Sequence, residues 1–206
     1  MPKDEWRASL RPRIEAARAA LSGRDAADLA RCGGLVSKGG SLELELLGQT
    51  YSIAWPQLTV SFSNGKRCPE ELAILLLDYL SRADSSVPTG DWLGFQELPD
   101  GMFYRQAFQG YSGDQLTTDL RGDIERFREA ALKLEGESLP IGDAAYAFRV
   151  LPHVSLAVVW WESDDDLPAN ATVLFDRVAS AYLPTDGLAI LGRMLCRTLA
   201  KAGGAG

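Results

Sequence analysis

Apolar residues recur at helical spacing at the start of the chain. Five of them are three or four positions apart, which would place them on one face of a helix: Trp6, Leu10, Ile14, Ala17 and Leu21. Ser22-Gly23 ends this run, and residues 25–31 favour a short second helix before Gly33-Gly34. The pattern therefore predicts an N-terminal helical segment over residues 1–31.

The period changes from helical to alternating over residues 41–62. Apolar and polar residues alternate in three short runs, around Leu44, Ile53 and Val60, with breaks at Gly48 and Pro56. Alternation of period two is typical of strands that bury one face. We therefore predict a three-stranded antiparallel meander with one apolar face.

A helix is predicted to begin after Pro69 and to cover this apolar face. Proline suits the first turn of a helix, and the acidic Glu70 and Glu71 follow it. Residues 92–108 are rich in aromatic side chains on both sides of Pro99-Asp100-Gly101. A hairpin is our interpretation of that segment, since the turn residues lie at its centre.

The last half of the chain predicts a long helix, three strands and a final helix. The long helix begins at Ser112, ends near Leu134 and contains Gly122. Strands follow over residues 146–150, 154–161 and 171–175, and the second of them is apolar enough to be central and buried on both faces. A helix after Pro184 precedes a tail, residues 203–206, that we expect to be disordered.

These elements predict an α+β fold in a single domain over residues 1–202. A mainly antiparallel sheet of about six strands would pack against several helices. The length of 206 residues suits one domain, and an apolar fraction of 46% is ordinary for a globular protein.

Charge and cysteine content exclude several classes of protein. The 21 Lys and Arg residues against 28 Asp and Glu residues give an acidic protein with a net charge of −7. This balance argues against nucleic-acid binding and against a polybasic membrane anchor. The longest apolar runs have six residues, so no membrane span is expected. Three scattered cysteines, Cys32, Cys68 and Cys196, favour reduced thiols in a cytoplasmic protein.

Nucleophile and metal motifs are weak. Gly110-Tyr111-Ser112-Gly113-Asp114 begins like the nucleophile elbow of a hydrolase but has Asp114 where that motif needs glycine, so Ser112 suits a turn or a helix cap better. The acidic run over 162–166 matches no calcium loop, and a solvated turn explains it. His153 is the only histidine, and its place between two strands favours a structural role.

The chain resembles a known family in several core and turn motifs. They are Ala145–Pro152, Val154–Trp161, Val173–Asp176, Tyr182-Leu183, Leu46–Ile53 and Leu75–Leu80. These motifs resemble a family of presumed domains of unknown function from anaerobic bacteria and archaea, over roughly residues 10–200. Some members of that family look fused to ferredoxin-type, Cys-rich iron–sulfur segments. The resemblance therefore implies a setting in low-potential redox or corrinoid-linked metabolism. It implies no cluster in this chain, which has no cysteine before Cys32.

These observations favour a non-catalytic accessory module over an enzyme. We expect it to bind a small planar cofactor of tetrapyrrole or corrinoid type, or a redox or corrinoid protein partner. The residues that would hold a cofactor are Trp92 and Tyr104 for stacking, Arg105 for a carboxylate and His153 as an axial ligand.

Two alternatives come from other classes of protein. The first is a carboxylate-based acid/base enzyme that uses residues such as Glu97 and Asp176, which would have to converge in one apolar cleft. The second is a homodimeric interaction protein that associates through an exposed apolar sheet face. One such face is suggested by Trp160 and Trp161, since adjacent residues of a strand point to opposite sides.

Overall fold

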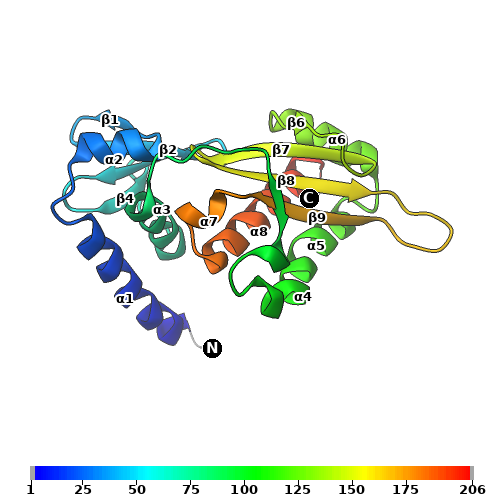
Figure 1. Ribbon diagram of the computed structural model, residues 1–206, viewed down its shortest axis with the longest axis horizontal. Coiled ribbons are helices and arrows are strands. Elements are labelled where there is room, and N and C mark those ends of the chain that lie inside the picture. The colour runs from blue at the N-terminus through cyan, green and yellow to red at the C-terminus, as the bar shows by residue number, and fades with distance from the viewer. Residues whose placement is uncertain (1–2, 205–206) are drawn as a thin grey trace. The chain divides into compact units, whose positions relative to one another are not determined.

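The strands of this protein form two antiparallel sheets, and helices pack on each of them (Figure 1). The computed structural model describes the backbone of residues 3–204 and the side chains of residues 12–204. The α+β class is therefore confirmed. The strands divide into sheets of four and five rather than forming one sheet of about six.

Internal contacts divide the chain into two compact units. Unit 1 contains residues 1–87, 151–153 and 181–183, and unit 2 contains residues 88–150, 154–180 and 184–206. The prediction of one domain over residues 1–202 stays a prediction.

The sheet of unit 1 has the strand order β1-β2-β3-β4. The strands are β1 (Val36–Lys38), β2 (Ser41–Leu46), β3 (Gln49–Ala54) and β4 (Thr59–Phe62). The predicted meander is confirmed as β2, β3 and β4, with Leu42 opposite Ile53 and Ile53 opposite Val60. These three side chains are buried, so the alternation does mark one apolar face. Strand β1 was not predicted, because all three of its residues are exposed.

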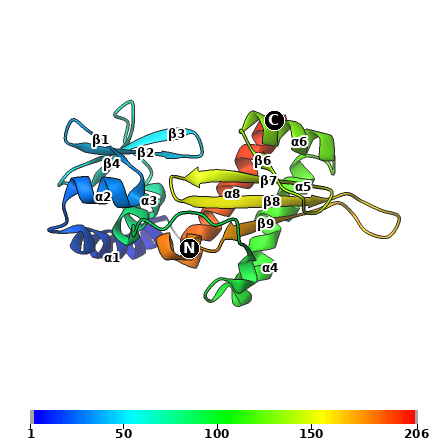
Figure 2. The same cartoon turned by 45° about the horizontal axis from the view of Figure 1, so that its top comes forward.

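Three helices pack in unit 1: α1 (Lys3–Leu21), α2 (Ala26–Gly33) and α3 (Glu70–Arg82). Figure 2 shows them on one side of the four-stranded sheet. Helix α3 begins after Pro69 as predicted and buries Leu76 and Tyr79. In α1, Ala17 and Leu21 are buried, whereas the predicted stripe residues Trp6 and Leu10 lie outside the described side chains. Asp25 caps α2 by accepting from the backbone N–H groups of Ala27 and Asp28.

The sheet of unit 2 has the order β5-β9-β8-β7-β6. The strands are β5 (Trp92–Gly94), β6 (Glu137–Ser138), β7 (Ala144–Leu151), β8 (Val154–Trp161) and β9 (Asn170–Asp176). Strand β8 is central, as its apolar sequence predicted. Trp160 is 0% exposed and Trp161 is 39% exposed, so the two indoles do point to opposite faces.

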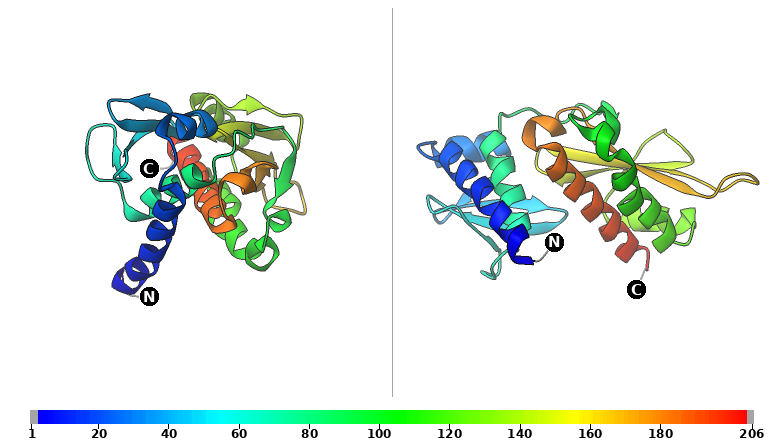
Figure 3. Two further views of the ribbon diagram at one scale, coloured as in Figure 1. Left: turned by 60° about the vertical axis from the view of Figure 1, so that its left-hand side comes forward. Right: turned by 90° about the horizontal axis from the view of Figure 1, so that it is seen from below.

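The helices of unit 2 differ from the prediction in two places. Their bounds are η1 (Phe95–Glu97), α4 (Gly101–Tyr111), α5 (Gly113–Asp119), α6 (Ile124–Lys133), α7 (Ala179–Tyr182, whose last two residues belong to unit 1) and α8 (Thr185–Ala202). The predicted hairpin over 92–108 is wrong, because only 92–94 is a strand and residues 101–111 are helical (Figure 3). Phe108 anchors α4 in the core by stacking on Phe95, with ring centroids 4.1 Å apart.

The predicted long helix from Ser112 to Leu134 is also interrupted. Arg121 and Gly122 have positive φ angles of 60° and 69°, which an α-helix does not accommodate. Asp123 then caps α6 by accepting from the N–H groups of Glu125 and Arg126.

The C-terminal helix ends close to where the sequence predicted. Helix α8 ends at Ala202, and the backbone N–H of Gly203 donates to the carbonyl of Leu199 (2.9 Å). Of the tail that was expected to be disordered, Gly203 and Gly204 form a turn, and Ala205 and Gly206 lie outside the described residues.

No helix within the described chain is long and apolar enough to cross a bilayer.

Candidate functional site

The four residues predicted to hold a cofactor belong to two different units. Trp92 is half-buried at the start of β5, and Tyr104 and Arg105 are exposed on α4, all in unit 2. His153 lies in the turn between β7 and β8 and belongs to unit 1. Among the described residues, no hydrogen bond or ring contact joins Trp92 to Tyr104 or to Arg105. The prediction that the four residues line one site stays a prediction.

The backbone of His153 takes part in a buried hydrogen-bonded cluster of unit 1. The Tyr79 hydroxyl donates to the carbonyl of Gly33 (2.7 Å), and the backbone N–H of His153 donates to the same hydroxyl (3.1 Å). The ring of Tyr182 stacks on Tyr79, with centroids 5.1 Å apart and planes inclined by 23°. The Tyr182 hydroxyl donates to the carbonyl of Ser86 (2.6 Å). Tyr79 and Tyr182 thus connect α2, α3, the β7–β8 turn and the loop after α3.

Burial keeps both of these phenols protonated. It raises the pKa of Tyr79, against the opposing effect of the hydrogen bond from His153. It raises the pKa of Tyr182 to about 12, and the charge of Asp84 acts in the same direction. Both hydroxyls are therefore donors near neutral pH rather than general bases, and this cluster stabilises the fold.

The imidazole of His153 is half-buried and lies close to the backbone of Gly34. A Cβ atom added at Gly34 would be 2.9 Å from the Nε2 atom of His153. No group of three or more His, Cys, Asp or Glu side chains within the described residues could hold a metal ion. Axial ligation by His153 stays a prediction.

The carboxylates of the acid/base alternative each shape a turn of unit 2. Asp176 is 0% exposed and accepts from the backbone N–H groups of Thr89 (2.9 Å), Gly90 (2.7 Å) and Val178 (3.1 Å). Glu97 is exposed and accepts from the N–H of Gly94 (2.6 Å). Both carboxylates therefore accept hydrogen bonds from backbone N–H groups, which is a structural role.

The nucleophiles noted in the sequence are all buried. Ser112 is fully buried between α4 and α5, and its hydroxyl donates to the carbonyl of Phe108. Cys32, Cys68 and Cys196 are free thiols with buried side chains. Burial raises the pKa of Cys68 to about 11 and that of Cys196 to about 12, so neither is a thiolate near neutral pH.

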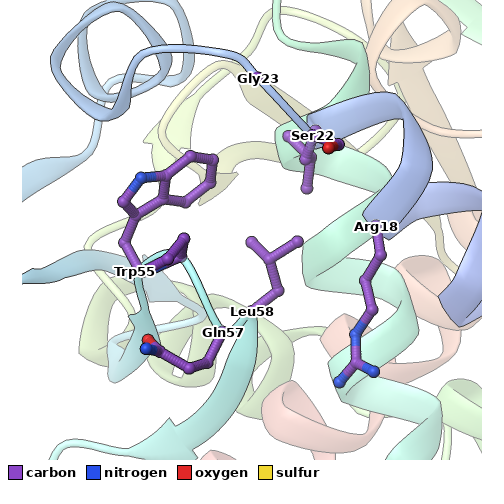
Figure 4. A pocket seen from close by; sticks show the side chains of 8 residues that line it. Arg18, Ser22, Gly23, Trp55, Gln57 and Leu58 are labelled. Atoms are coloured by element: carbon purple, nitrogen blue, oxygen red, sulfur yellow. The ribbon is translucent and has the colours of Figure 1, made fainter.

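A cavity of about 220 Å³ lies in unit 1 between the end of α1 and the turn from β3 to β4 (Figure 4). Its lining is Arg18, Leu21, Ser22, Gly23, Trp55, Pro56, Gln57 and Leu58. Figure 4 shows the Trp55 indole and the Arg18 side chain on opposite sides of Leu58. Leu21 and Leu58 are buried, Trp55 is half-buried and Arg18 is exposed. The cavity therefore combines an apolar floor, an aromatic wall and one cation at the rim.

Local backbone structure explains why these residues meet. Helix α1 ends at Leu21, where Arg24 donates from its backbone N–H to the Leu21 carbonyl (3.2 Å), and Gly23 has a φ angle of +80°. In the β3–β4 turn, the N–H of Leu58 donates to the carbonyl of Ala54 (2.7 Å). This turn directs Trp55 and Leu58 towards the end of α1 (Figure 4).

This cavity was not predicted from the sequence, in which the alternation before Pro56 places Trp55 in a predicted strand. The strand β3 ends one residue earlier, at Ala54, so the indole belongs to the turn. One local signal could have indicated this position: Trp55 directly precedes Pro56, and proline favours turns. A turn at this point places the aromatic ring in the turn rather than on a face of the sheet. The facing residues are more than 30 positions earlier in the chain, so no local pattern pairs the two segments.

Comparison with known protein families gives a match over most of the chain. The model of the family described as Domain of unknown function (DUF3786) matches residues 25–198. The chain belongs to the DUF3786 family. The resemblance seen in the sequence is thereby confirmed as far as a domain of unknown function. No curated protein and no solved structure matches the chain.

The DUF3786 match covers most of both units but begins after α1. Residues 55–58 of the cavity lie inside the match, whereas Arg18, Leu21, Ser22 and Gly23 lie before it. Half of the lining residues thus come from α1 and the two residues after it, which precede the matched segment.

Proposed function

We propose that this DUF3786 protein is a non-catalytic binding module that takes a small planar molecule in the cavity beside Trp55. The observation that carries the proposal is the cavity itself, which is lined by a half-buried indole together with the buried side chains of Leu21 and Leu58. Binding sites for small molecules are typically concave and apolar, with a few polar groups that fix orientation. The Trp55 ring offers a face on which a flat ligand can stack.

The volume of the cavity limits the size of the ligand that it can hold. Pockets that enclose drug-sized molecules typically measure about 300–1,000 Å³. A cavity of about 220 Å³ suits a molecule of one or two rings, and a tetrapyrrole or corrinoid ring would extend beyond it. The proposal therefore favours a small planar ligand over the larger cofactors that the anaerobic, corrinoid-linked setting suggested.

Ligand-observed saturation-transfer NMR with benzamide and benzoate as probes tests the proposal. We expect both probes to bind the full chain with millimolar affinity, as suits ligands of this size. Trp55→Ala should abolish the transfer, whereas the matched control Trp161→Ala, which removes a partly exposed indole of unit 2, should retain it. Absence of transfer from both probes to the native protein would overturn the proposal.

The larger cofactors have their own test. An absorbance titration with haem and with cobalamin, repeated on His153→Ala, detects axial ligation through a shift of the visible bands. A shift that is lost in His153→Ala would favour the site expected from the sequence over the cavity beside Trp55. A partner protein and a homodimer remain separate predictions, and the mass in light scattering tests the second.

A further inference from the structure

One cation stands at the rim of an otherwise neutral cavity. Of the eight lining residues, only Arg18 is charged, and the lining contains no acidic side chain. No described residue forms an ion pair with Arg18, whereas Arg13 on the same helix binds Asp78 at 2.7 Å. The guanidinium of Arg18 is therefore available to a ligand in the cavity, and guanidinium groups bind carboxylates through paired N–H donors.

The C-terminal end of α1 contributes a negative charge near the cavity, but this charge is smaller than the positive charge of Arg18. The last carbonyl groups of a helix carry a partial negative charge, equivalent to about half an elementary charge, and they lie near Ser22 and Gly23. Arg18 carries a full positive charge on a side chain that lines the same space. The net charge at the rim of the cavity is therefore positive, and it favours a ligand with an anionic group near Arg18.

We propose that the ligand of this cavity is a small aromatic carboxylate, held by Trp55 through its ring and by Arg18 through its carboxylate group. This inference rests on the proposed function and names the class of ligand. Figure 4 shows the side chains of Trp55 and Arg18 on opposite sides of the floor formed by Leu58. A ring that stacks on the indole would reach Arg18 through a substituent that extends across Leu58. Ser22 and Gln57 also line the cavity and supply neutral polar groups.

Arg18 also has a purely structural explanation, which the test must separate from binding. A basic residue in the last turn of a helix stabilises that helix by complementing its dipole. That role would change the stability of the protein equally with or without ligand. It would not distinguish an anionic probe from a neutral probe of the same shape.

Benzoate and benzamide form such a matched pair, and NMR titrations of both probes with three proteins test the inference. In the native protein, benzoate should bind more tightly than benzamide, and added salt should weaken only benzoate. Arg18→Gln should weaken benzoate by about fivefold, the upper range for a solvent-exposed ion pair, and leave benzamide unchanged. Arg197→Gln, which removes an exposed cation from α8, is the matched control and should bind both probes as the native protein does.

The outcomes distinguish this inference from the proposed function. Equal affinity for both probes, unchanged in Arg18→Gln but lost in Trp55→Ala, would overturn the anionic class and keep the binding module. A loss of benzoate binding in Arg197→Gln as large as that in Arg18→Gln would show a general effect of net charge and would overturn the inference. Binding of neither probe to the native protein would overturn both proposals.

Discussion

The backbone N–H of His153 donates to the hydroxyl of Tyr79, which itself donates to the carbonyl of Gly33. One buried phenol therefore satisfies a donor and an acceptor from two segments that are about 120 residues apart in the chain. A buried backbone group without a partner is costly, so this hydroxyl contributes to stability through both of its bonds.

Tyr79→Phe is expected to lower the free energy of unfolding by about 1–3 kcal/mol, because it leaves both backbone groups without their partner. Urea denaturation followed by circular dichroism measures the loss. Tyr104→Phe removes an exposed hydroxyl and should change stability little. Equal effects of the two substitutions would contradict the role assigned to the Tyr79 hydroxyl.

Gly34→Ala is expected to destabilise the protein for two separable reasons. Gly34 has a φ angle of +66°, and a Cβ atom there would be 2.9 Å from both Pro152 Cβ and His153 Nε2. The His153 side chain can move aside, but the proline ring cannot. Gly39→Ala is the matched control, since its φ angle is +56° with no atom within 4 Å of the added Cβ.

The positive φ angle alone should cost each variant about 1 kcal/mol of unfolding free energy. The additional loss in Gly34→Ala, about 1–3 kcal/mol, measures the steric contact with the β7–β8 turn. Thermal or urea unfolding of the pair gives this difference directly. A Gly34→Ala variant no less stable than Gly39→Ala would show that the turn accommodates the extra methyl group.

Asp176→Ala should destabilise unit 2 by about 2 kcal/mol, since it removes the acceptor of three backbone N–H groups. Asp176→Asn keeps one acceptor oxygen and should lie between the native protein and the alanine variant. The comparison is Asp91→Ala, whose exposed carboxylate only approaches Arg177 at 3.5 Å. Hydrogen exchange of the Thr89 and Gly90 amides should increase in Asp176→Ala and stay unchanged in Asp91→Ala.

Stability is expected to fall as the pH rises above about 9. Burial raises the pKa of Cys196 from its ordinary value of 9.0 to about 12, and that of Tyr182 from 10.0 to about 12. Between these values the unfolded chain loses protons that the folded chain keeps, so alkali favours the unfolded state. Below pH 9 both states are protonated and this contribution to stability is intact.

Urea midpoints measured from pH 7 to pH 11 test this expectation. Cys196→Ala should show a shallower decline with pH than the native protein, because one of the responsible groups is gone. Alkylation with iodoacetamide at pH 8, mapped by mass spectrometry, should modify Cys68 and Cys196 only after unfolding. Rapid modification of Cys196 in the folded protein would argue against its burial.

The parts of the fold that the sequence predicted are those in which burial follows a simple period. The alternation of Leu42, Ile53 and Val60 reflects one buried sheet face, and the apolar run of β8 reflects a central strand. The segment that became α4 lacks such a signal. Met102, Phe103 and Tyr104 are exposed, with Phe103 at 84%, so their hydrophobicity says nothing about which side of the helix is buried.

The break between α5 and α6 could have been predicted from the local sequence. Gly122 followed by Asp123 combines a residue suited to positive φ with a good helix N-cap, and the structure uses both. The cavity beside Trp55 could not have been predicted from the local sequence. Its two halves come from distant segments, and the contact between them depends on tertiary packing rather than on any periodic pattern.

Unit 1 is assembled from three separate segments of the chain, and this has a consequence for its folding during synthesis. Its first 87 residues leave the ribosome before residues 151–153 and 181–183, which supply His153 and the ring of Tyr182. At translation rates of about 5–20 residues per second, the 96 residues from 88 to 183 take roughly 5–20 s to make. Throughout that interval Tyr79 lacks its later partners, so the nascent first unit must persist in an incomplete form until residue 183 has been made.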